Sequence, residues 1–275
     1  MKVVSLVENT TTNEDFVCEH GLSLYIETNN HKILFDMGQS DLFAENGKKL
    51  GIDLAQVDMV ILSHGHYDHG GGLKKFLEIN SKAPVYISKY AFGEYYNGTE
   101  KYIGLDITLK NSARIVFTDG KVELAEGLTL YHCNDREKSY ELGSFGLNKK
   151  EEGIFVPDDF LHEQYLSIKE NGKHVLISGC SHKGILNIAE WFQPDVLVGG
   201  FHFSKLPLDE ILEGYAKVLD GYDTAYYTCH CTGIKQYQFM KNYMKQINYL
   251  ATGNEIEIKG EHECDLHTVH IVETN

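Results

Sequence analysis

Alternating and clustered apolar positions predict strands and helices in regular succession along the chain. The run 22–38 contains two strand-like stretches separated by Asn29 and Asn30, which is typical of a β-hairpin. The stretches that follow predict a helix over 41–52, a buried strand over 57–63, a helix over 73–82 and a strand over 83–90. This order of strand, loop, helix and strand favours parallel pairing.

The rest of the chain mixes hairpin signals with alternating strands and helices. Asn171 and Gly172 lie between two β-rich stretches and mark a second hairpin turn. The predicted elements are strands over 113–119, 121–133 and 165–179, a helix over 184–192, a strand over 195–200, a helix over 207–220, a strand over 224–229 and a helix over 233–247. Together the halves predict an α/β (α+β) fold, a four-layer αββα sandwich of two mixed β-sheets. A doubly wound open sheet is the alternative, and the hairpins disfavour it because they create antiparallel pairs.

Composition and charge narrow the class of protein. The 275 residues include four prolines and no low-complexity segment, so residues 1–275 are interpreted as one domain. No stretch approaches the roughly 18 apolar residues of a membrane-spanning helix, and the first residues turn polar too soon for a signal peptide. Six scattered cysteines favour reduced thiols, so we expect a cytoplasmic protein. The formal charge of -15 argues against nucleic acid or membrane partners and leaves a small-molecule substrate.

Possible metal ligands are most concentrated in the stretch 61–73, ILSHGHYDHGGGL, at the end of a predicted strand. His64 and His66 are two residues apart, so in extended backbone their side chains point the same way and can grip one metal ion. Asp68 and His69 precede glycines that allow a turn toward a second metal ion. The alternative, a polar turn that only solvates a strand end, is disfavoured by this density. The sequence therefore predicts two divalent metal ions, with zinc as the default and iron, manganese or magnesium as alternatives.

The motif HGHYDH resembles the His-x-His-x-Asp-His signature of the metallo-β-lactamase fold, whose members hold one or two metal ions between two β-sheets. Asp36, in ILFDMG at the end of a predicted strand, is similar to the first motif of that superfamily. The resemblance implies that Asp36 hydrogen-bonds to the metal loop without touching the metal. A turn-forming aspartate before Gly38 is the alternative.

Three later stretches are similar to the branch named for dihydropterin-ribofuranosylaminobenzene 5′-phosphate synthase. They are ISGCSHKGILN at 177–187, VGGFHFS at 198–204 and TCHCTG at 228–233. The resemblance implies that His182 and His230 are the remaining metal ligands. Cys180 falls where many members carry a bridging aspartate and is the alternative to His182. His202 is placed at the mouth of the site, where it could bind substrate or supply a proton, although a strand-end turn would also explain it.

Other ligand-type and aromatic residues are harder to place. His132 and His162 are further candidates for the superfamily ligand that is missing here, and a structural or exposed role is favoured for both. The stretch 265–273 is interpreted as a terminal strand. A second metal site there is less favoured, and its candidates are His262, Cys264, His267 and His270. An aromatic segment could be a lid, a dimer contact that makes a homo-oligomer, or ordinary core; it comprises Tyr86, Tyr90, Phe92, Tyr95, Tyr96 and Tyr102.

The expected chemistry follows from two metal ions about 3.5 to 4 Å apart, which share a water as hydroxide. This metal-bound hydroxide would attack an ester, lactone or phosphoester, with Asp68 and His202 as the catalytic residues. The glycines at 70–72 are expected to leave room for substrate and to favour an anion, so a phosphate-bearing substrate would fit. A metal-dependent hydrolase is the leading hypothesis. The alternatives are a pterin transferase (synthase) releasing pyrophosphate, as the branch implies, a redox protein and a non-catalytic metal-binding module.

Overall fold

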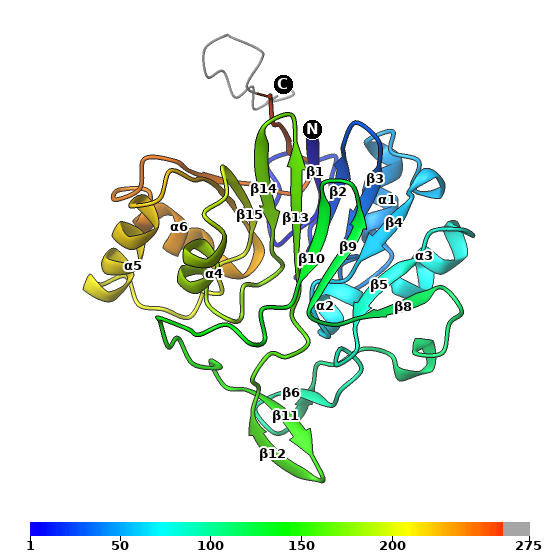
Figure 1. The fold of residues 1–275 in the computed structure, drawn as a ribbon, viewed down its shortest axis with the longest axis horizontal. Helices are drawn as coiled ribbons and strands as arrows, with labels where there is room; N and C mark the ends of the chain where they lie inside the picture. Colours follow the sequence, from blue (N-terminus) through cyan, green and yellow to red (C-terminus); the bar gives the residue numbers. More distant parts are fainter. Residues whose placement is uncertain (261–275) are drawn as a thin grey trace.

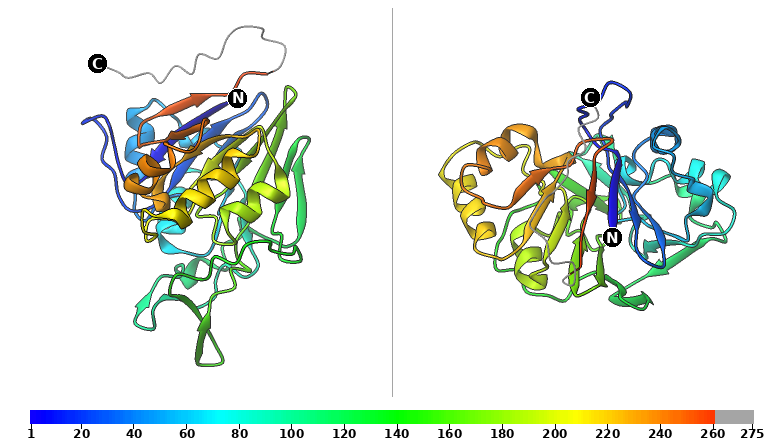
Figure 2. Two further views of the ribbon diagram at one scale, coloured as in Figure 1. Left: turned by 90° about the vertical axis from the view of Figure 1, so that its left-hand side faces the viewer. Right: turned by 90° about the horizontal axis from the view of Figure 1, so that it is seen from above.

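Two seven-stranded mixed sheets face each other, and helices cover their outer faces (Figures 1 and 2). In this computed structural model, residues 1–260 are described. The first sheet has the order β18-β1-β2-β3-β4-β5-β8. Its strands are β1 (Lys2–Val7), β2 (Ser23–Glu27), β3 (Lys32–Phe35), β4 (Met59–Ile61), β5 (Val85–Ser88), β8 (Ile115–Thr118) and β18 (Glu255–Glu257). The helices of this half are α1 (Leu42–Lys49), α2 (Tyr67–Gly70) and α3 (Leu73–Ile79).

The second sheet has the order β17-β16-β15-β14-β13-β10-β9. Its strands are β9 (Lys121–Ala125), β10 (Leu128–Tyr131), β13 (Tyr165–Glu170), β14 (Lys173–Ile177), β15 (Val196–Gly199), β16 (Ala225–Thr228) and β17 (Ile247–Tyr249). Helices α4 (Ile185–Phe192), α5 (Glu210–Asp220) and α6 (Ile234–Met240) pack outside it. The predicted αββα sandwich of two mixed sheets is confirmed.

The core between the sheets explains why alternate strand residues are apolar. Ile26 and Ile61 of the first sheet belong to the same buried cluster as Val175 and Val198 of the second. Leu34 and Val60, which alternate with these positions, instead face the helices of their own half. Sheets that are buried on both faces need apolar residues throughout, which accounts for the near-continuous apolar runs.

Both predicted hairpins are present. Glu27 pairs with Lys32 across the loop that contains Asn29 and Asn30. Glu170 pairs with Lys173, and the two residues between them, Asn171 and Gly172, have φ of 51° and 79°. Positive φ at both turn residues is the conformation that a two-residue hairpin turn favours, and asparagine and glycine adopt it most readily.

A third sheet was not predicted. It has the order β12-β11-β6-β7 and projects from the sandwich at the bottom of Figure 1. Its strands are β6 (Tyr95–Asn97), β7 (Lys101–Tyr102), β11 (Leu147–Glu151) and β12 (Ile154–Pro157). Tyr95, Tyr96 and Tyr102 of the aromatic segment thus lie on β6 and β7, whereas Tyr86 lies on β5. β6 pairs with β11 about 50 residues later in the chain, a register that only the tertiary structure supplies.

The chain geometry brings several loops to one end of the sandwich. β3, β4 and β5 pair in parallel, as do β14, β15 and β16, so within each set the carboxyl ends lie at the same edge. Ligands of open α/β sheets bind outside such carboxyl ends. Among the described residues, no helix is long and apolar enough to cross a membrane. The expected terminal strand and the C-terminal histidines and cysteine lie outside the described residues.

Candidate metal centre

Three histidines from two loops form the first half of a buried cluster. His64 and His66 follow β4, and His182 follows β14; their exposed fractions are 0%, 4% and 7%. The Nε2 atoms of His64 and His182 lie 3.3 Å apart, and the three side chains can each offer one ligand atom within 4.8 Å of the others. This group fits one metal ion bound by three imidazoles.

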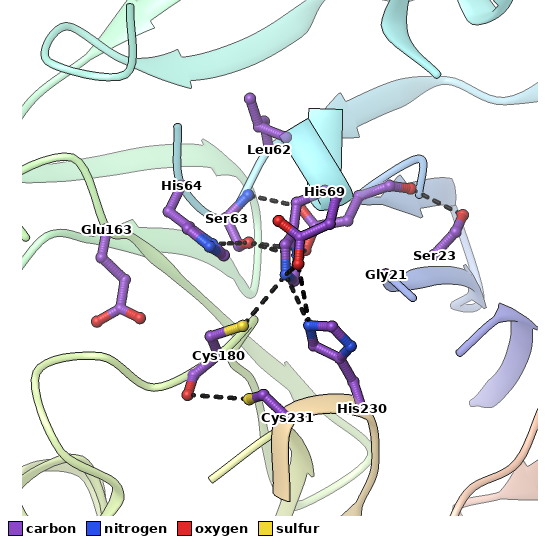
Figure 3. Close-up of polar contacts among 12 residues, drawn as sticks. Gly21, Ser23, Leu62, Ser63, His64, His69, Glu163, Cys180, His230 and Cys231 are labelled. Atoms are coloured by element: carbon purple, nitrogen blue, oxygen red, sulfur yellow. Dashed lines mark hydrogen bonds and ion pairs between the residues drawn. The ribbon is translucent and has the colours of Figure 1, made fainter. Parts of the chain in front are cut away.

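A second group adjoins the first. Asp68 and His69 come from α2, and His230 begins the short 3-10 helix η3 (His230–Thr232) after β16. The His69 and His230 Nε2 atoms are 3.2 Å apart, and Asp68 Oδ2 lies 3.7 Å and 3.4 Å from them. Cys180 Sγ is 3.2 Å from His69 Nε2, and Figure 3 shows Cys180 and His230 pointing toward His69. The predicted turn before the glycines is a single helical turn, because Asp68 and His69 lie on the four-residue helix α2.

The structure brings together both residues that the sequence offered as alternatives. His182 lies against His64, and Cys180 lies against His69, so each adds to a different half of the cluster. Glu163 holds this loop in place: its carboxylate accepts the backbone N–H groups of His182 at 2.6 Å and Lys183 at 3.0 Å. The buried Tyr165 hydroxyl also donates to Glu163, at 2.5 Å.

Hydrogen bonds fix which nitrogen of each ring is free. Asp36 Oδ2 accepts from His69 Nδ1 at 2.6 Å, and Asn9 Oδ1 accepts from His230 Nδ1 at 2.7 Å. Ser63 Oγ donates to Asp36 and therefore accepts from His64 Nδ1, at 2.8 Å. When the rings are neutral, all three then carry the lone pair on Nε2, and two of these Nε2 atoms, those of His69 and His230, lie 3.2 Å apart.

Two Nε2 atoms at this distance need either a cation or a shared proton between them; burial would lower the pKa of His69, but Asp36 and Asp68 raise it, so His69 can supply that proton in the protein without metal. A divalent metal ion satisfies this requirement, and hydrogen-bonded Nδ1 atoms with metal-directed Nε2 atoms are the usual arrangement of metal-bound histidine. Buried His182 Nδ1 and His66 Nε2 also have no hydrogen-bond partner. The donor set of imidazole, carboxylate and thiol therefore fits the metal ions that the sequence predicts.

Asp36 has the location that the family resemblance implied. It follows β3 directly, is fully buried and has a φ of 61°, a conformation that is unusual for aspartate. Its carboxylate also accepts from Ser63 N at 2.7 Å, and its backbone oxygen accepts from Ser23 Oγ at 2.8 Å. Asp36 thus connects the end of β3 to the loop after β4 and to His69.

Burial and neighbouring charges set the protonation of the cluster. Burial, followed by the other histidines, lowers the pKa of His64 and His182 well below the usual value. Burial alone would raise the pKa of Asp68, but His69 and the hydrogen bonds from His20 and His230 hold it well below its usual value. Neutral imidazoles and an ionised carboxylate are the forms that bind metal.

Cys180 differs from the other ligand candidates. Burial and then the neighbouring Cys231 raise the pKa of its thiol. A coordinating thiol is deprotonated by the metal itself, so this shift concerns the protein without metal.

His202 lies at the edge of the cluster, after β15, and has a φ of 57°. Its ring is centred 4.4 Å from that of His182 and 5.1 Å from that of Phe145. Its backbone N–H donates to Cys231 Sγ at 3.3 Å, and its Nδ1 has no partner. Burial, followed by nearby His66 and His230, lowers the pKa of His202 to about 3. A neutral, unpartnered imidazole beside the metal ligands can contact a substrate.

His162 lies beside His66 and forms a further group of ligand-type residues with His66 and Asp158, whereas His132 lies away from the cluster. His162 Nδ1 accepts from the backbone N–H of Gly65, and its Nε2 donates to Asp158 at 3.0 Å. Both ring nitrogens of His162 thus have partners, and the contact of Nδ1 holds the loop between His64 and His66. His132 is buried, donates to Thr118 Oγ1 at 3.2 Å and belongs to none of the ligand clusters among residues 1–260.

The glycines after His69 do not leave room for a substrate. A Cβ at Gly71 would overlap the carbonyl oxygen of Gln39, and a Cβ at Gly72 would overlap that of Met37 and the Phe43 ring. At Gly70 it would lie 2.5 Å from the Leu105 side chain. This part of the sequence interpretation is wrong: the glycines allow close packing of α2 and the loop after β3. The stretch 61–73 therefore combines residues that can bind metal with glycines that allow close packing of the chain.

Several residues around the cluster had no role in the sequence interpretation. Glu8 and Asn9 follow β1 directly, and polar residues at the end of an apolar run are a signal that could have marked them. His20 belongs to no motif, and its Nε2 lies 3.2 Å from Asp68 Oδ2. Glu163 and Asp158 belong to no motif in the sequence, and only the folded structure shows that they lie next to the site.

The arrangement agrees with a known protein family. The family model of the metallo-beta-lactamase superfamily matches residues 17–219. The chain belongs to the metallo-β-lactamase superfamily. It is a metal-dependent hydrolase of this superfamily.

Relatives of this superfamily member cover nearly its whole length. An uncharacterised protein of Methanocaldococcus jannaschii is 32% identical over 244 residues, which is 85% of this chain and 91% of that protein. The 7,8-dihydropterin-6-methyl-4-(beta-D-ribofuranosyl)-aminobenzene-5'-phosphate synthase of the same organism is 29% identical and covers 94% of this chain and 96% of its own. A crystal structure of a metal-dependent hydrolase of the β-lactamase superfamily matches with a TM-score of 0.80 and 31% identity, over 94% of this chain and 99% of that one.

Proposed function

We propose that this protein is a two-metal hydrolase that cleaves an ester, lactone or phosphoester bond of a small molecule. The observation that carries the proposal is the pair of adjoining ligand groups with facing Nε2 atoms. His64, His66 and His182 would hold one metal ion, and Asp68, His69, His230 and Cys180 the other.

Zinc is the metal that we propose, because the set contains imidazoles and one thiol. The Zn²⁺-bound PqqB of Methylobacterium extorquens has the same fold, with a TM-score of 0.55 and 10% identity, which supports zinc only as a metal that this fold accepts. Iron is the alternative that the Cys180 thiol would also suit, whereas manganese and magnesium prefer oxygen ligands. When bound, two such ions lower the pKa of a water and polarise the bond under attack.

The chain's own residues would orient the reaction. Asp68 is ionised and fixed by three histidines, so it holds the second half of the cluster together. His202 is neutral, lies beside His182 and is not held by a hydrogen bond at Nδ1. We propose that His202 hydrogen-bonds to the substrate at the oxygen that develops charge, a role in which it need not change its protonation.

The substrate that we propose is a small molecule. A formal charge of -15 disfavours nucleic acid and anionic membranes as partners. The glycines at 70–72 no longer support a phosphate group, because they are packed against the chain. A phosphate-bearing substrate is therefore a proposal that needs its own test.

We also propose a cytoplasmic location. It fits the five described cysteines, which are all free thiols.

A second candidate function is pterin transfer with release of pyrophosphate. It is favoured by the 29% identity to the dihydropterin synthase, which extends over 94% of this chain. The same metal cluster could serve it, because a leaving pyrophosphate needs the same electrostatic stabilisation as a leaving alkoxide.

A parallel activity screen separates these two functions. The zinc-loaded protein would be assayed against lactones, carboxylic esters, phosphomonoesters and phosphodiesters, beside a dihydropterin pyrophosphate with an aromatic amine acceptor. We expect hydrolysis of at least one ester class, abolished by the substitution His69→Ala. Turnover of the pterin pyrophosphate alone would refute hydrolysis and establish the transferase. Size-exclusion chromatography with light scattering on the same sample would show whether the protein forms a homo-oligomer.

A further inference from the structure

Asn9 connects two histidines on the open side of the second ligand group. It follows β1 by two residues and belongs to the loop that leads from β1 to β2. Its Oδ1 lies 2.7 Å from His230 Nδ1 and 3.3 Å from the backbone nitrogen of Gly21, and its Nδ2 lies 3.3 Å from His20 Nδ1. One amide group thus contacts two imidazoles and one backbone group.

The backbone contact decides the orientation of this amide. The Gly21 N–H can only donate a hydrogen bond, so the Asn9 atom that faces it must be the carbonyl oxygen. That oxygen then accepts the proton of His230 Nδ1, which leaves the lone pair of His230 Nε2 directed at His69 and Asp68. The amide nitrogen faces the other way and must donate to His20 Nδ1.

The tautomer of His20 follows from this donation. A ring whose Nδ1 accepts a hydrogen bond carries its proton on Nε2. This N–H lies 3.2 Å from Asp68 Oδ2, the same oxygen that faces His69 and His230. The His20 side chain is 57% exposed, whereas that of Asp68 is 11% exposed, so His20 forms the solvent-facing side of this carboxylate.

Glu8 holds the backbone from which Asn9 extends. Glu8 is fully buried, and its Oε2 accepts the backbone N–H of His230 and the Tyr249 hydroxyl, both at 2.9 Å. Its own backbone N–H donates to Thr252 Oγ1 at 2.8 Å. Adjacent residues of one strand end therefore grip the same histidine at its backbone and at its ring, and His230 is kept in a left-handed conformation with φ of 49°.

We propose that Asn9 is a positioning residue for the second metal, which fixes His230 with its lone pair toward the metal and His20 with its N–H toward Asp68. This inference rests on the proposed two-metal site. Asn9 and Glu8 lie before residue 17, where the match to the superfamily model begins, so they are outside the matched residues.

Two substitutions separate the two contacts of Asn9. Asn9→Ala removes the acceptor of His230 and the donor to His20, whereas Asn9→Asp keeps the acceptor and loses the donor. Asn46→Ala is the control: Asn46 is a buried asparagine that donates to the carbonyl oxygens of Leu6 and Val17, near the same loop, but contacts none of the proposed ligands. Each variant would be titrated with zinc against a chromophoric chelator. Histidine nitrogen–proton NMR spectra of the zinc-loaded proteins would report the Nδ1–H of His230 and its exchange with water.

For Asn9→Ala we expect the weaker of two zinc affinities to fall about 10- to 100-fold, the usual effect of removing a hydrogen-bond partner of a metal-bound histidine. The exchange-protected Nδ1–H signal of His230 should be lost. Asn9→Asp should retain that signal and bind zinc within about threefold of the wild type. Asn46→Ala should lower the melting temperature, because it removes two buried hydrogen bonds, and should leave both zinc affinities unchanged.

Unchanged zinc affinity in Asn9→Ala, with a protected His230 signal, would overturn the role of Asn9 while leaving the two-metal proposal intact. An equal loss of zinc in Asn46→Ala would also overturn it, because the effect would then be one of general stability. A wild-type protein that binds fewer than two zinc ions would instead refute the proposed two-metal function. In that case the NMR signal of His230 in Asn9→Ala, lost or retained, still decides the role of Asn9.

Discussion

Cys180 and His182 lie two residues apart in one loop and point at different histidines. Cys180 Sγ is 3.2 Å from His69 Nε2, and His182 Nε2 is 3.3 Å from His64 Nε2. Two carboxylate contacts of Glu163 to the backbone of residues 182 and 183 keep the loop in the conformation that makes this possible. The two side chains therefore do not compete for one ligand position.

Single substitutions should remove different metals. We expect Cys180→Ser to weaken the zinc ion near His69 and His182→Ala to weaken the one near His64, each leaving about one tightly bound ion, because each half loses one of its ligands. Elemental analysis after dialysis gives the stoichiometry. Cobalt substitution gives the assignment, since a thiolate-to-cobalt charge-transfer band should vanish in Cys180→Ser and persist in His182→Ala. A band that survives in Cys180→Ser would show that Cys180 is no ligand.

His202 should affect turnover without affecting metal. We expect His202→Ala to bind two zinc ions normally and to reduce kcat by at least about tenfold, because a hydrogen bond to the developing charge is worth roughly 1.4 kcal/mol or more in a buried site. Zinc content and steady-state kinetics on the substrate found in the screen are the measurements. Turnover equal to that of the wild type would show that His202 has no catalytic role and serves only in the turn after β15.

Among the elements, the strands and hairpins were predictable and the third sheet was not. Runs such as 22–38 and 165–179 combine β-rich stretches with an Asn-Asn or Asn-Gly turn, so local chemistry specifies them. β6 and β11 pair across about 50 residues, and their stability depends on burying Tyr95, Ile103, Leu147 and Phe160 together. The Phe160 ring then stacks on His182, with centroids 4.5 Å apart. A pairing of this range leaves no local pattern in the sequence.

The glycines after His69 should be sensitive to the addition of one methyl group. We expect Gly71→Ala to lower the free energy of unfolding by about 2 kcal/mol or more, because its Cβ would overlap the Gln39 carbonyl. Gly214→Ala, within α5 and with no atom within 4 Å of the added Cβ, is the control and should be neutral or stabilising by up to about 1 kcal/mol. Urea unfolding of both variants measures the difference. Equal stability of the two would contradict the packing role of Gly71.

At the scale of the whole molecule, we expect metal binding and folding to be coupled. The ligands come from loops after β4, β14 and β16, and hydrogen bonds from Asn9 and Asp36 add the ends of β1 and β3. Both sheets therefore contribute to one cluster. A metal ion that binds only the folded chain links the two sheets at this edge and stabilises the native state by mass action.

Chelation should therefore destabilise the protein. At a free zinc concentration about 1,000 times the dissociation constant, each site adds about 4 kcal/mol, and removal of zinc should lower the melting temperature correspondingly. Thermal unfolding with EDTA, followed by added zinc, measures the loss and its reversal. The double substitution His69→Ala with His230→Ala should shrink the response to zinc. A melting temperature that chelation does not change would argue against tightly bound metal.

The sequence by itself determined the fold class, the hairpins and the metal-ligand motif, because these depend on the periodicity of apolar residues and on side chains that are neighbours in the chain. The tertiary structure decided that Cys180 lies against His69 and His182 against His64, that the glycines pack against Gln39 and Met37, and that Asn9 reaches His230. These contacts join segments up to about 220 residues apart. Their geometry is fixed by how two sheets pack, and no local pattern carries that information.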